Sequence, residues 1–487
     1  MKVWRRIATD TLIYGSADFV SKLIIFASFP IVAARLSTEV FGVFELVMSL
    51  TNILGLLANV GLNNAAQRYY WDGETGEAGR SRLVSTGLLL LTFTTTGISA
   101  IFLFAALTVE ASDIVKLGAY GLSLLGVAAA LGLMVAMQIT QYILDVLRLQ
   151  FRPWHFFTFA LIARAGAAIA LVFAVVLRGQ SLDGMFVSQF ILVFLALPLG
   201  VWLIRSDLTP RLDGSFVKPL LQYGYPFIFV TSAFWLMASM DRWMIASMMS
   251  VSDVGLYSIA SRFATITLFC STAFGMAWSP WSIKLRTDSP NTYRRSYAGL
   301  LVAMLSVMLF ICTSVALFAS EILVFLMPVE YHLAAPAFVL IVLSVAIQSS
   351  HHIAAVGISL EKRTPLLARV AWIAVGINLV FNLTLIGPFG IVGAAWATVL
   401  ANVGLIWGYF HYSQKLHPIP IRWGYLAALG AIWGIVCVIS LNTMNYDLNI
   451  TVIGAKSVGL FALVVVLIPL VRGHAWRVGI DEDGAAT

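Results

Sequence analysis

Apolar runs long enough to cross a lipid bilayer recur along the whole chain, and no other feature restricts its fold as strongly. A membrane-spanning helix needs about 20 mostly apolar residues. The 487 residues are 60% hydrophobic and only 11% charged, whereas a soluble domain carries about 25% charged residues. We therefore expect an all-α polytopic membrane protein. Fourteen helices are predicted, at 12–33, 41–62, 83–107, 116–137, 156–177, 183–204, 225–248, 255–277, 298–318, 333–357, 367–387, 391–412, 424–441 and 453–471.

Positive charge divides unevenly between the two sides of this arrangement. Cytoplasmic loops carry an excess of Lys and Arg. With the N-terminus in the cytoplasm, 22 of the 30 Lys and Arg residues fall on the cytoplasmic side, and only Arg35, Lys116, Arg178 and Lys456 fall opposite. The division predicts that both termini are cytoplasmic. It also accounts for the net charge of +7 without a nucleic-acid partner.

Motifs of soluble catalysis do not stand out. The stretch GETGEAGRS at 73–81 lacks the Gly-Lys-Ser/Thr ending of a phosphate-binding loop. His351 and His352 are neighbours in one predicted helix, so they point about 100° apart and do not form a metal-binding pair on one face. The predicted loops are short. We expect a protein that is not an enzyme and that uses no metal or cofactor, apart from an ion that drives transport.

Charged residues inside the predicted helices are the candidates for function, because a charge at the bilayer centre costs at least about 2.5 kcal/mol. Asp241 and Arg242 stand together within WLMASMDRWMIASMM at 235–249. Either Arg242 lines a cationic cavity while Asp241 pairs with a neighbouring cation, or both residues tie their helix to the next through Arg262. The full set consists of the cations Lys22, Arg164, Arg242 and Arg262 and the acids Asp18, Glu45 and Asp241.

The acidic members have two open roles. Asp18 and Lys22 are spaced i,i+4, so they can form a pair within one helix, either to neutralise each other or to line a cavity. Asp18, Glu45 and Asp241 are candidates for such charge pairs or for coupling transport to an ion. Protons and sodium ions are both open as the driving ion.

Two stretches of the chain repeat a pattern. RLSTEVFGVFELVMSLTNI (35–53) and MMSVSDVGLYSIASRFATI (248–266) each place an acidic residue and Val before a Gly and an aromatic residue, at the entry to the second helix of a pair. Their offset of 213 residues corresponds to six predicted helices. Such internal repeats are typical of transporters. The pattern predicts a lobe at 1–222, a second lobe at 223–414, and two further helices with a cytoplasmic tail at 415–487.

A third stretch carries a resemblance to a known family. Residues 359–404 place Asn378 and Asn382 one turn apart, followed by the turn GPFG and a helix that begins with small residues. Together with the two repeated hairpins, this string resembles the polysaccharide-transporter branch of the multidrug/oligosaccharidyl-lipid/polysaccharide (MOP) flippase superfamily. The resemblance extends over residues 1–471.

That resemblance implies two six-helix lobes around a central cavity and transport by alternating access. The implied activity is a flippase of the bacterial inner membrane that moves undecaprenyl-pyrophosphate-linked oligosaccharides for O-antigen (lipopolysaccharide), capsule or exopolysaccharide synthesis. Its implied partners are this anionic lipid-linked oligosaccharide, membrane lipids and a polysaccharide polymerase complex. The cations Lys22, Arg164, Arg242 and Arg262 would then form the binding cavity, since guanidinium groups suit phosphate.

Two rival functions stay open at this stage. A lipid II flippase, which serves peptidoglycan synthesis, would differ mainly in the sugar. A cation-coupled multidrug antiporter should have a mostly acidic cavity, whereas here four cations face three acids. The inventory therefore favours an anionic cargo. A membrane-embedded polymerase would need a large external loop, which the predicted topology does not contain.

Overall fold

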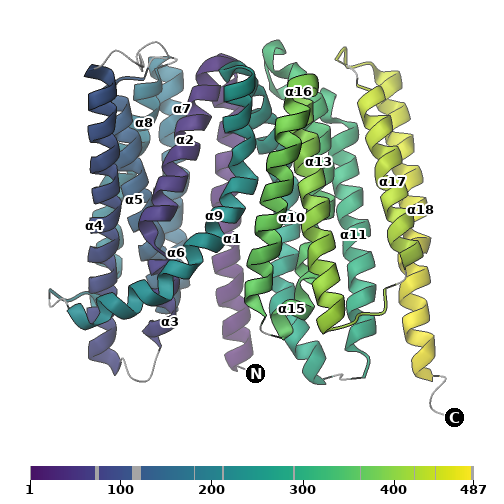
Figure 1. The fold of residues 1–487 in the computed structure, drawn as a ribbon, viewed down its shortest axis with the longest axis horizontal. Coiled ribbons are helices and arrows are strands. Elements are labelled where there is room, and N and C mark those ends of the chain that lie inside the picture. The colour runs from purple at the N-terminus through teal and green to yellow at the C-terminus, as the bar shows by residue number, and fades with distance from the viewer. Residues whose placement is uncertain are drawn as a thin grey trace. The chain divides into compact units, whose positions relative to one another are not determined.

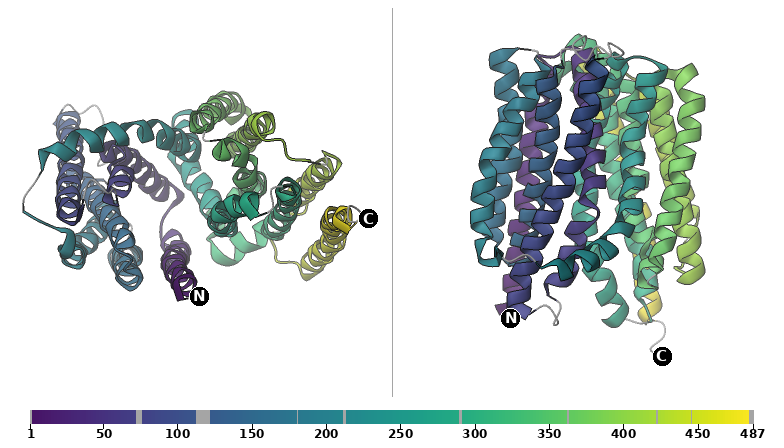
Figure 2. Two further views of the ribbon diagram at one scale, coloured as in Figure 1. Left: turned by 90° about the horizontal axis from the view of Figure 1, so that it is seen from below. Right: turned by 60° about the vertical axis from the view of Figure 1, so that its left-hand side comes forward.

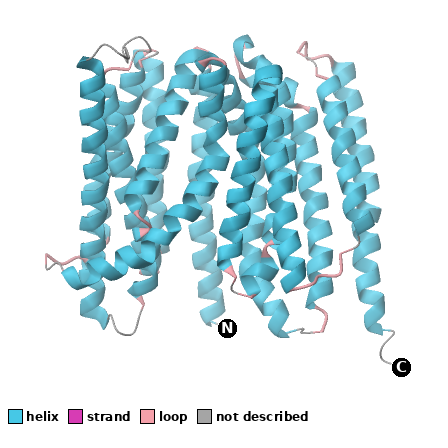
Figure 3. Cartoon of the chain, viewed as in Figure 1, coloured by secondary structure: helices cyan, strands magenta, loops and turns pink. Residues whose placement is uncertain are grey.

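A computed structural model describes residues 2–71, 76–111, 122–179, 181–210, 213–288, 291–361, 363–421, 423–444 and 446–483. These residues form helices joined by loops, with no strand among them (Figure 3). Thirteen helical segments of this part of the chain are long and apolar enough to cross a membrane. The expectation of an all-α polytopic membrane fold is confirmed.

The chain forms two compact units, Met1–Trp235 and Leu236–Thr487. Helix α9 (Val217–Met248) begins in the first unit and ends in the second. The division into lobes at 1–222 and 223–414 with a tail at 415–487 stays a prediction.

In the first unit, helices α4, α5 and α8 run side by side in Figure 1, and the left view of Figure 2 looks nearly along their axes. Helix α1 packs against α6, α7 and the segment between them. Large buried side chains such as Tyr142, Phe156 and Phe159 fill the core. The elements are α1 (Lys2–Ala33), α2 (Thr38–Asn59), α3 (Leu62–Tyr70), α4 (Gly76–Ala111), α5 (Leu124–Leu149), α6 (Pro153–Ala160), the π-helix η2 (Leu161–Ala165), α7 (Gly166–Arg178), α8 (Leu182–Leu203), and the short η3 (Arg205–Asp207) and η4 (Gly214–Phe216).

Helix α5 differs from its prediction. The expected helix was 116–137, whereas α5 runs from Leu124 to Leu149; residues 116–121, with Lys116, lie outside the described part. Ser123 caps the start of α5, because the Ser123 hydroxyl accepts a hydrogen bond from the Gly126 N–H. The prediction ended too early because polar residues follow position 137. Among these residues, Gln141 and Asp145 stay helical because they are hydrogen-bonded inside the bundle.

In the second unit, α13 packs against α10, α11 and α16, and nearly all of its residues are buried. Helices α17 and α18 both pack against α11. The elements are α10 (Val251–Asp288), α11 (Tyr293–Leu317), α12 (Ala319–Leu326), the 3-10 helix η5 (Val329–Ala334), α13 (Ala335–Ser349), α14 (His351–Ala354), α15 (Val356–Leu360), α16 (Thr364–Leu416), α17 (Trp423–Asn442) and α18 (Ile450–Asp483).

Element α16 is two helices in one. Its backbone turns at Gly390, where φ is 59° and ψ is −140°, a conformation that glycine adopts at low cost. The Tyr409 hydroxyl donates to the Leu367 carbonyl 42 residues earlier, which a straight helix could not allow. The predicted pair of helices at 367–387 and 391–412, joined by GPFG, is therefore present. It brings the number of candidate spans in the described part of the chain to the fourteen that were predicted.

Lys456 makes a buried ion pair. It belongs to α18 and is only 5% exposed; its assignment to the external side stays a prediction. Its Nζ lies 2.6 Å from Oε1 of Glu321 on α12, which is 7% exposed. A buried cation needs a partner, and the carboxylate of Glu321 supplies it. This ion pair ties α18 to the rest of the second unit.

Candidate functional site

Three of the predicted charged residues meet in the first unit. Asp18 and Lys22 lie one turn apart on α1, with 2.7 Å between Oδ2 and Nζ. Arg164 approaches from η2, with its Nη1 3.2 Å from Asp18 Oδ1. The carboxylate of Asp18 therefore contacts two cations. The side chains of Asp18 and Lys22 are 41% and 42% exposed, so neither is enclosed within the first unit.

Arg164 is presented by an unusual piece of backbone. The π-helix Leu161–Ala165 is inserted between α6 and α7. Its hydrogen bonds run between residues five apart, which locally widens the helix, and such segments are frequent at functional sites. Helix α1 packs against this segment. The widened turn thus carries the guanidinium to Asp18 on the neighbouring helix.

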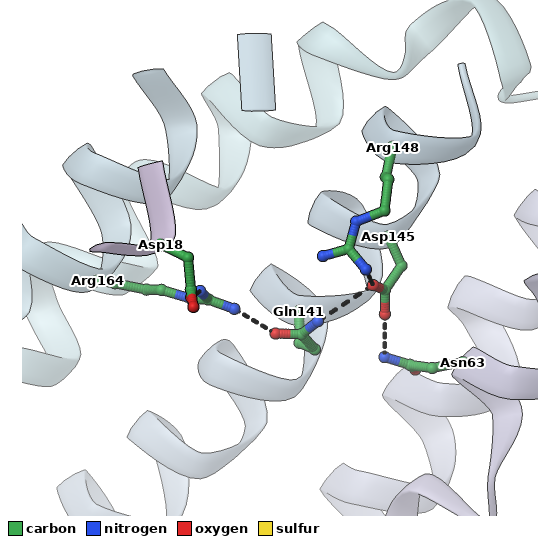
Figure 4. A network of polar contacts seen from close by, with 6 residues as sticks. All are labelled: Asp18, Asn63, Gln141, Asp145, Arg148 and Arg164. Carbon is green, nitrogen blue, oxygen red and sulfur yellow. Dashed lines mark hydrogen bonds and ion pairs between the residues drawn. The ribbon is translucent and has the colours of Figure 1, made fainter. Parts of the chain in front are cut away.

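A chain of polar contacts continues from Arg164 into α5 (Figure 4). The Nη2 of Arg164 donates to Oε1 of Gln141 at 2.5 Å. Gln141 in turn donates to Oδ1 of Asp145 at 3.2 Å, and Asn63 of α3 donates to Oδ2 of the same carboxylate at 2.8 Å. The guanidinium of Arg148 lies 3.8 Å from Asp145. The buried carboxylate is therefore held by two carboxamides and one exposed cation.

Asp145 and Gln141 were missed by the sequence analysis. Gln141, Asp145 and Arg148 are spaced i, i+4 and i+7, which places them on one face of a helix. That signal was present in the sequence. It was overlooked because the predicted helix ended at 137, so these residues were assigned to a link.

Asp241 lies in a second polar cluster, within the second unit. Tyr257 donates to its Oδ2 at 2.6 Å, and Thr398 donates to the same oxygen at 2.8 Å. Asn382 donates to Oδ1 at 2.6 Å and also to Oδ1 of Asn378 at 3.1 Å. The two asparagines come from one arm of α16 and Thr398 from the other, so the turn at Gly390 assembles the cluster.

The expectation that Asp241 pairs with a neighbouring cation stays a prediction. Among the described residues, its hydrogen bonds come from one amide and two hydroxyl groups. Arg242 is adjacent in the helix and therefore points about 100° away. The carboxylate of Asp241 is 3% exposed, and it is stabilised chiefly by neutral donors.

The remaining candidates are spread over both units. Arg242 on α9 and Arg262 on α10 are partly buried in the second unit, and Glu45 on α2 is 4% exposed in the first. The structure thus brings together Asp18, Lys22 and Arg164, and it places Asp241 in a separate set of neutral donors. We call the first set the charge cluster.

The charge cluster suits an anion rather than a metal ion. Guanidinium and ammonium groups donate charge-assisted hydrogen bonds to phosphate oxygens. Within the described ranges, no group of three or more His, Cys, Asp or Glu side chains is placed to hold a metal. The chemistry available is binding and release of a charged ligand.

A comparison with known families identifies the chain at the level of the family. The family model described as "Polysaccharide biosynthesis protein" matches residues 7–286, more than half of the chain. The chain belongs to this family. Its charge cluster and its cluster around Asp241 both involve residues of that matched region.

One curated relative of this chain is the "Probable low-salt glycan biosynthesis flippase Agl15" of Haloferax volcanii. The two are 27% identical over 222 residues, which is 42% of this chain. The match spans 45% of the relative, less than half of its length.

Solved structures show the same fold at low sequence identity. "Lipid II flippase MurJ, inward closed conformation" is 13% identical, with a TM-score of 0.69 over 95% of this chain and 99% of the other. A multidrug resistance MATE family transporter of the MOP superfamily, in an inward-facing conformation, is 15% identical, with a TM-score of 0.63 over 84% and 96%. A mutant of the Vibrio cholerae MATE transporter VcmN is 14% identical, with a TM-score of 0.53 over 84% and 98%. This family member therefore has the MATE/MOP-like fold of a multi-pass membrane protein.

Proposed function

We propose that the protein is a flippase for lipid-linked oligosaccharides. Its cargo would be an undecaprenyl-pyrophosphate-linked repeat unit, moved across the bacterial inner membrane for O-antigen, capsule or exopolysaccharide synthesis. Membership of the polysaccharide biosynthesis family and similarity to a relative named as a glycan biosynthesis flippase support this proposal. A polysaccharide polymerase complex would be the partner that receives the product.

The observation that carries the proposal is the charge cluster. Lys22 and Arg164 share one carboxylate, Asp18, inside helices of membrane-spanning length. Cations at such positions are expensive and usually mark a transport pathway. A pyrophosphate leaving water loses its hydration shell, and the two cations replace that shell with charge-assisted hydrogen bonds.

Transport would proceed by alternating access between the two lobes, as inverted-repeat transporters do. Asp241 is the candidate for coupling to an ion gradient, because it is a buried carboxylate surrounded by neutral oxygen and amide groups. Binding of a proton or a sodium ion would neutralise it. Both ions suit a carboxylate, and separately imposed proton and sodium gradients would distinguish them.

The proposal is tested with purified protein in liposomes. Three fluorescent cargoes are compared in one assay of translocation: an undecaprenyl-pyrophosphate-linked oligosaccharide, lipid II, and a cationic dye. We expect translocation of the oligosaccharide lipid, none of the dye, and slow movement of lipid II at most. Preference for lipid II would make the protein a peptidoglycan-precursor flippase, and transport of the dye would make it a drug antiporter.

A further inference from the structure

Four carboxamide side chains gather beside the charge cluster. Nδ2 of Asn59, the last residue of α2, donates to Oδ1 of Asn63 at 2.9 Å and to Oε1 of Gln138 at 3.1 Å. Asn63 and Gln141 both donate to Asp145, as Figure 4 shows. We call Asn59, Asn63, Gln138 and Gln141 the carboxamide cluster. It joins α2, α3 and α5 and touches the charge cluster through the bond between Gln141 and Arg164.

The packing of α2 against α5 leaves room for this cluster. Gly55 of α2 faces Gln138, and a Cβ at Gly55 would lie 2.6 Å from Nε2 of that glutamine. Real Cβ atoms do not approach so closely, so a side chain at position 55 would displace Gln138. Glycine at this position therefore keeps the carboxamide of Gln138 in place.

Hydrogen-bonding groups of the cluster remain unused. A carboxamide has two N–H donors and an oxygen with two lone pairs. Within the described part of the chain, Nε2 of Gln138 donates no hydrogen bond and Oδ1 of Asn59 accepts none. Neither atom is among the fully enclosed polar atoms that lack a partner, and both side chains are only partly buried. Polar groups among membrane-spanning helices cost several kcal/mol when unsatisfied. We therefore expect water or a polar ligand to satisfy these two groups.

The unused groups match a sugar better than an ion. An anion would require donors alone, and a cation would require oxygens alone. Gln138 offers N–H groups and Asn59 offers an oxygen, and both belong to one hydrogen-bonded pair. A sugar hydroxyl both donates and accepts, so it can bond to both. The carboxylate of Asp145 beside the cluster already accepts from Asn63 and Gln141.

We propose that the carboxamide cluster binds the first sugar of the cargo, while Lys22 and Arg164 bind its pyrophosphate. This inference rests on the proposed function. In a lipid-linked oligosaccharide the first sugar is bonded directly to the pyrophosphate, so the two subsites must be adjacent. The contact of 2.5 Å between Arg164 and Gln141 supplies that adjacency. Gln138 and Asn59 are the residues that contact the sugar.

The test measures binding of two lipids to purified protein. The probes are undecaprenyl diphosphate and undecaprenyl-diphospho-N-acetylglucosamine, which differ only in the sugar. The variants are Gln138→Met and Asn59→Leu, which keep the volume and remove the polar groups. Each variant should lose roughly five- to tenfold in affinity for the sugar-bearing lipid, the effect of one or two net hydrogen bonds. Affinity for undecaprenyl diphosphate should not change, which also shows that the variants are folded.

Controls separate this proposal from the function on which it rests. Gln189→Met replaces a buried carboxamide of α8 that donates to the Met185 carbonyl, outside the cluster, and should leave both affinities unchanged. Arg164→Ala should weaken the binding of both lipids to the same extent. If it does so while Gln138→Met and Asn59→Leu change nothing, the sugar subsite is refuted and the proposed function stands. If the wild-type protein binds neither lipid, both proposals fail.

Two further outcomes would also overturn the inference. An equal loss of affinity for both lipids in the Gln138→Met variant would show that the carboxamide cluster only positions Arg164. Binding of free N-acetylglucosamine with the same dependence on Gln138 and Asn59 would assign the site to a soluble sugar. We expect free N-acetylglucosamine not to compete, because it lacks the pyrophosphate that the charge cluster holds.

Discussion

The guanidinium of Arg164 contacts the carboxylate of Asp18 at 3.2 Å and the carboxamide of Gln141 at 2.5 Å. One side chain from a π-helix thus joins α1 to α5. It is also the residue through which the charge cluster and the carboxamide cluster meet. Arg164 is therefore the first residue to test for a role in binding the cargo.

Arg164→Lys should lower transport by roughly 10- to 100-fold, because a lysine ammonium replaces a planar fork that makes charge-assisted hydrogen bonds in two directions. The measurement is the rate of lipid-linked oligosaccharide translocation, normalised to folded protein. Arg205→Lys is the matched control, since Arg205 lies over the ring of Trp202 in the same unit and outside both clusters. Transport by Arg164→Lys at the wild-type rate would show that the planar guanidinium of Arg164 is not required.

Arg242→Ala should accumulate as folded protein and lose most of its transport. Asp241 keeps three neutral donors, so removal of the neighbouring guanidinium does not strand that carboxylate. The decisive comparison is the double variant Asp241→Asn with Arg242→Gln. If that variant transports at the wild-type rate, Arg242 is not a substrate ligand, and the interpretation of Arg242 as a residue that ties helices together is favoured.

Asp241→Asn should uncouple transport from the driving ion, because an amide carries no charge to neutralise. Translocation of the lipid-linked oligosaccharide by the wild-type protein should respond to an imposed proton gradient or to an imposed sodium gradient, each tested separately. The variant should translocate the lipid at a rate that does not depend on either gradient. Asn382→Leu should weaken the response without abolishing it. A variant Asp241→Asn that responds to the gradient as the wild type does would exclude this residue from coupling.

Lys456→Met should destabilise the second unit. Removing one partner of a buried ion pair typically costs about 3–5 kcal/mol, because the other charge is left unpaired. Thermal unfolding in detergent should show a lower midpoint, and the double variant Lys456→Met with Glu321→Gln should recover much of the loss. Lys415→Met, at an exposed lysine of the same unit, is the control. An unchanged midpoint in Lys456→Met would mean that the pair does not hold α18 in place.

The orientation predicted from the charge distribution has its own test. In a background without Cys270, Cys312 and Cys437, a cysteine at the exposed position 215 should resist an impermeant external thiol reagent. A cysteine at position 447, also exposed, should react. The reverse pattern of labelling would place both termini outside the cytoplasm.

The sequence predicted helices well and their contacts poorly. The lengths of the apolar runs predicted the positions of the membrane-spanning helices, and the sequence GPFG predicted the turn at Gly390. Spacing along one helix also placed Asp18 next to Lys22. Arg164 could not be assigned to this pair, because which helices touch depends on side-chain packing between segments far apart in the chain.

Two further features of the first unit were not predicted. The π-helix at 161–165 forms in the apolar stretch LIARA, which reads as an ordinary helix. The polar face of α5 was discounted because polar residues usually end a membrane span. Here Gln141 and Asp145 are tolerated since their hydrogen bonds are made within the bundle. The buried position of Lys456 was hidden for a similar reason, because its partner Glu321 is 135 residues away.

The most direct test of the central claim is a translocation assay in proteoliposomes. A fluorescent undecaprenyl-pyrophosphate-linked oligosaccharide is placed in one leaflet, and its arrival in the other is followed with a membrane-impermeant glycosidase. Wild-type protein should translocate the lipid faster than protein-free liposomes do, and Lys22→Ala with Arg164→Ala should fall to the protein-free rate while remaining folded. Translocation by this double variant at the wild-type rate would contradict the claim that the charge cluster carries the cargo.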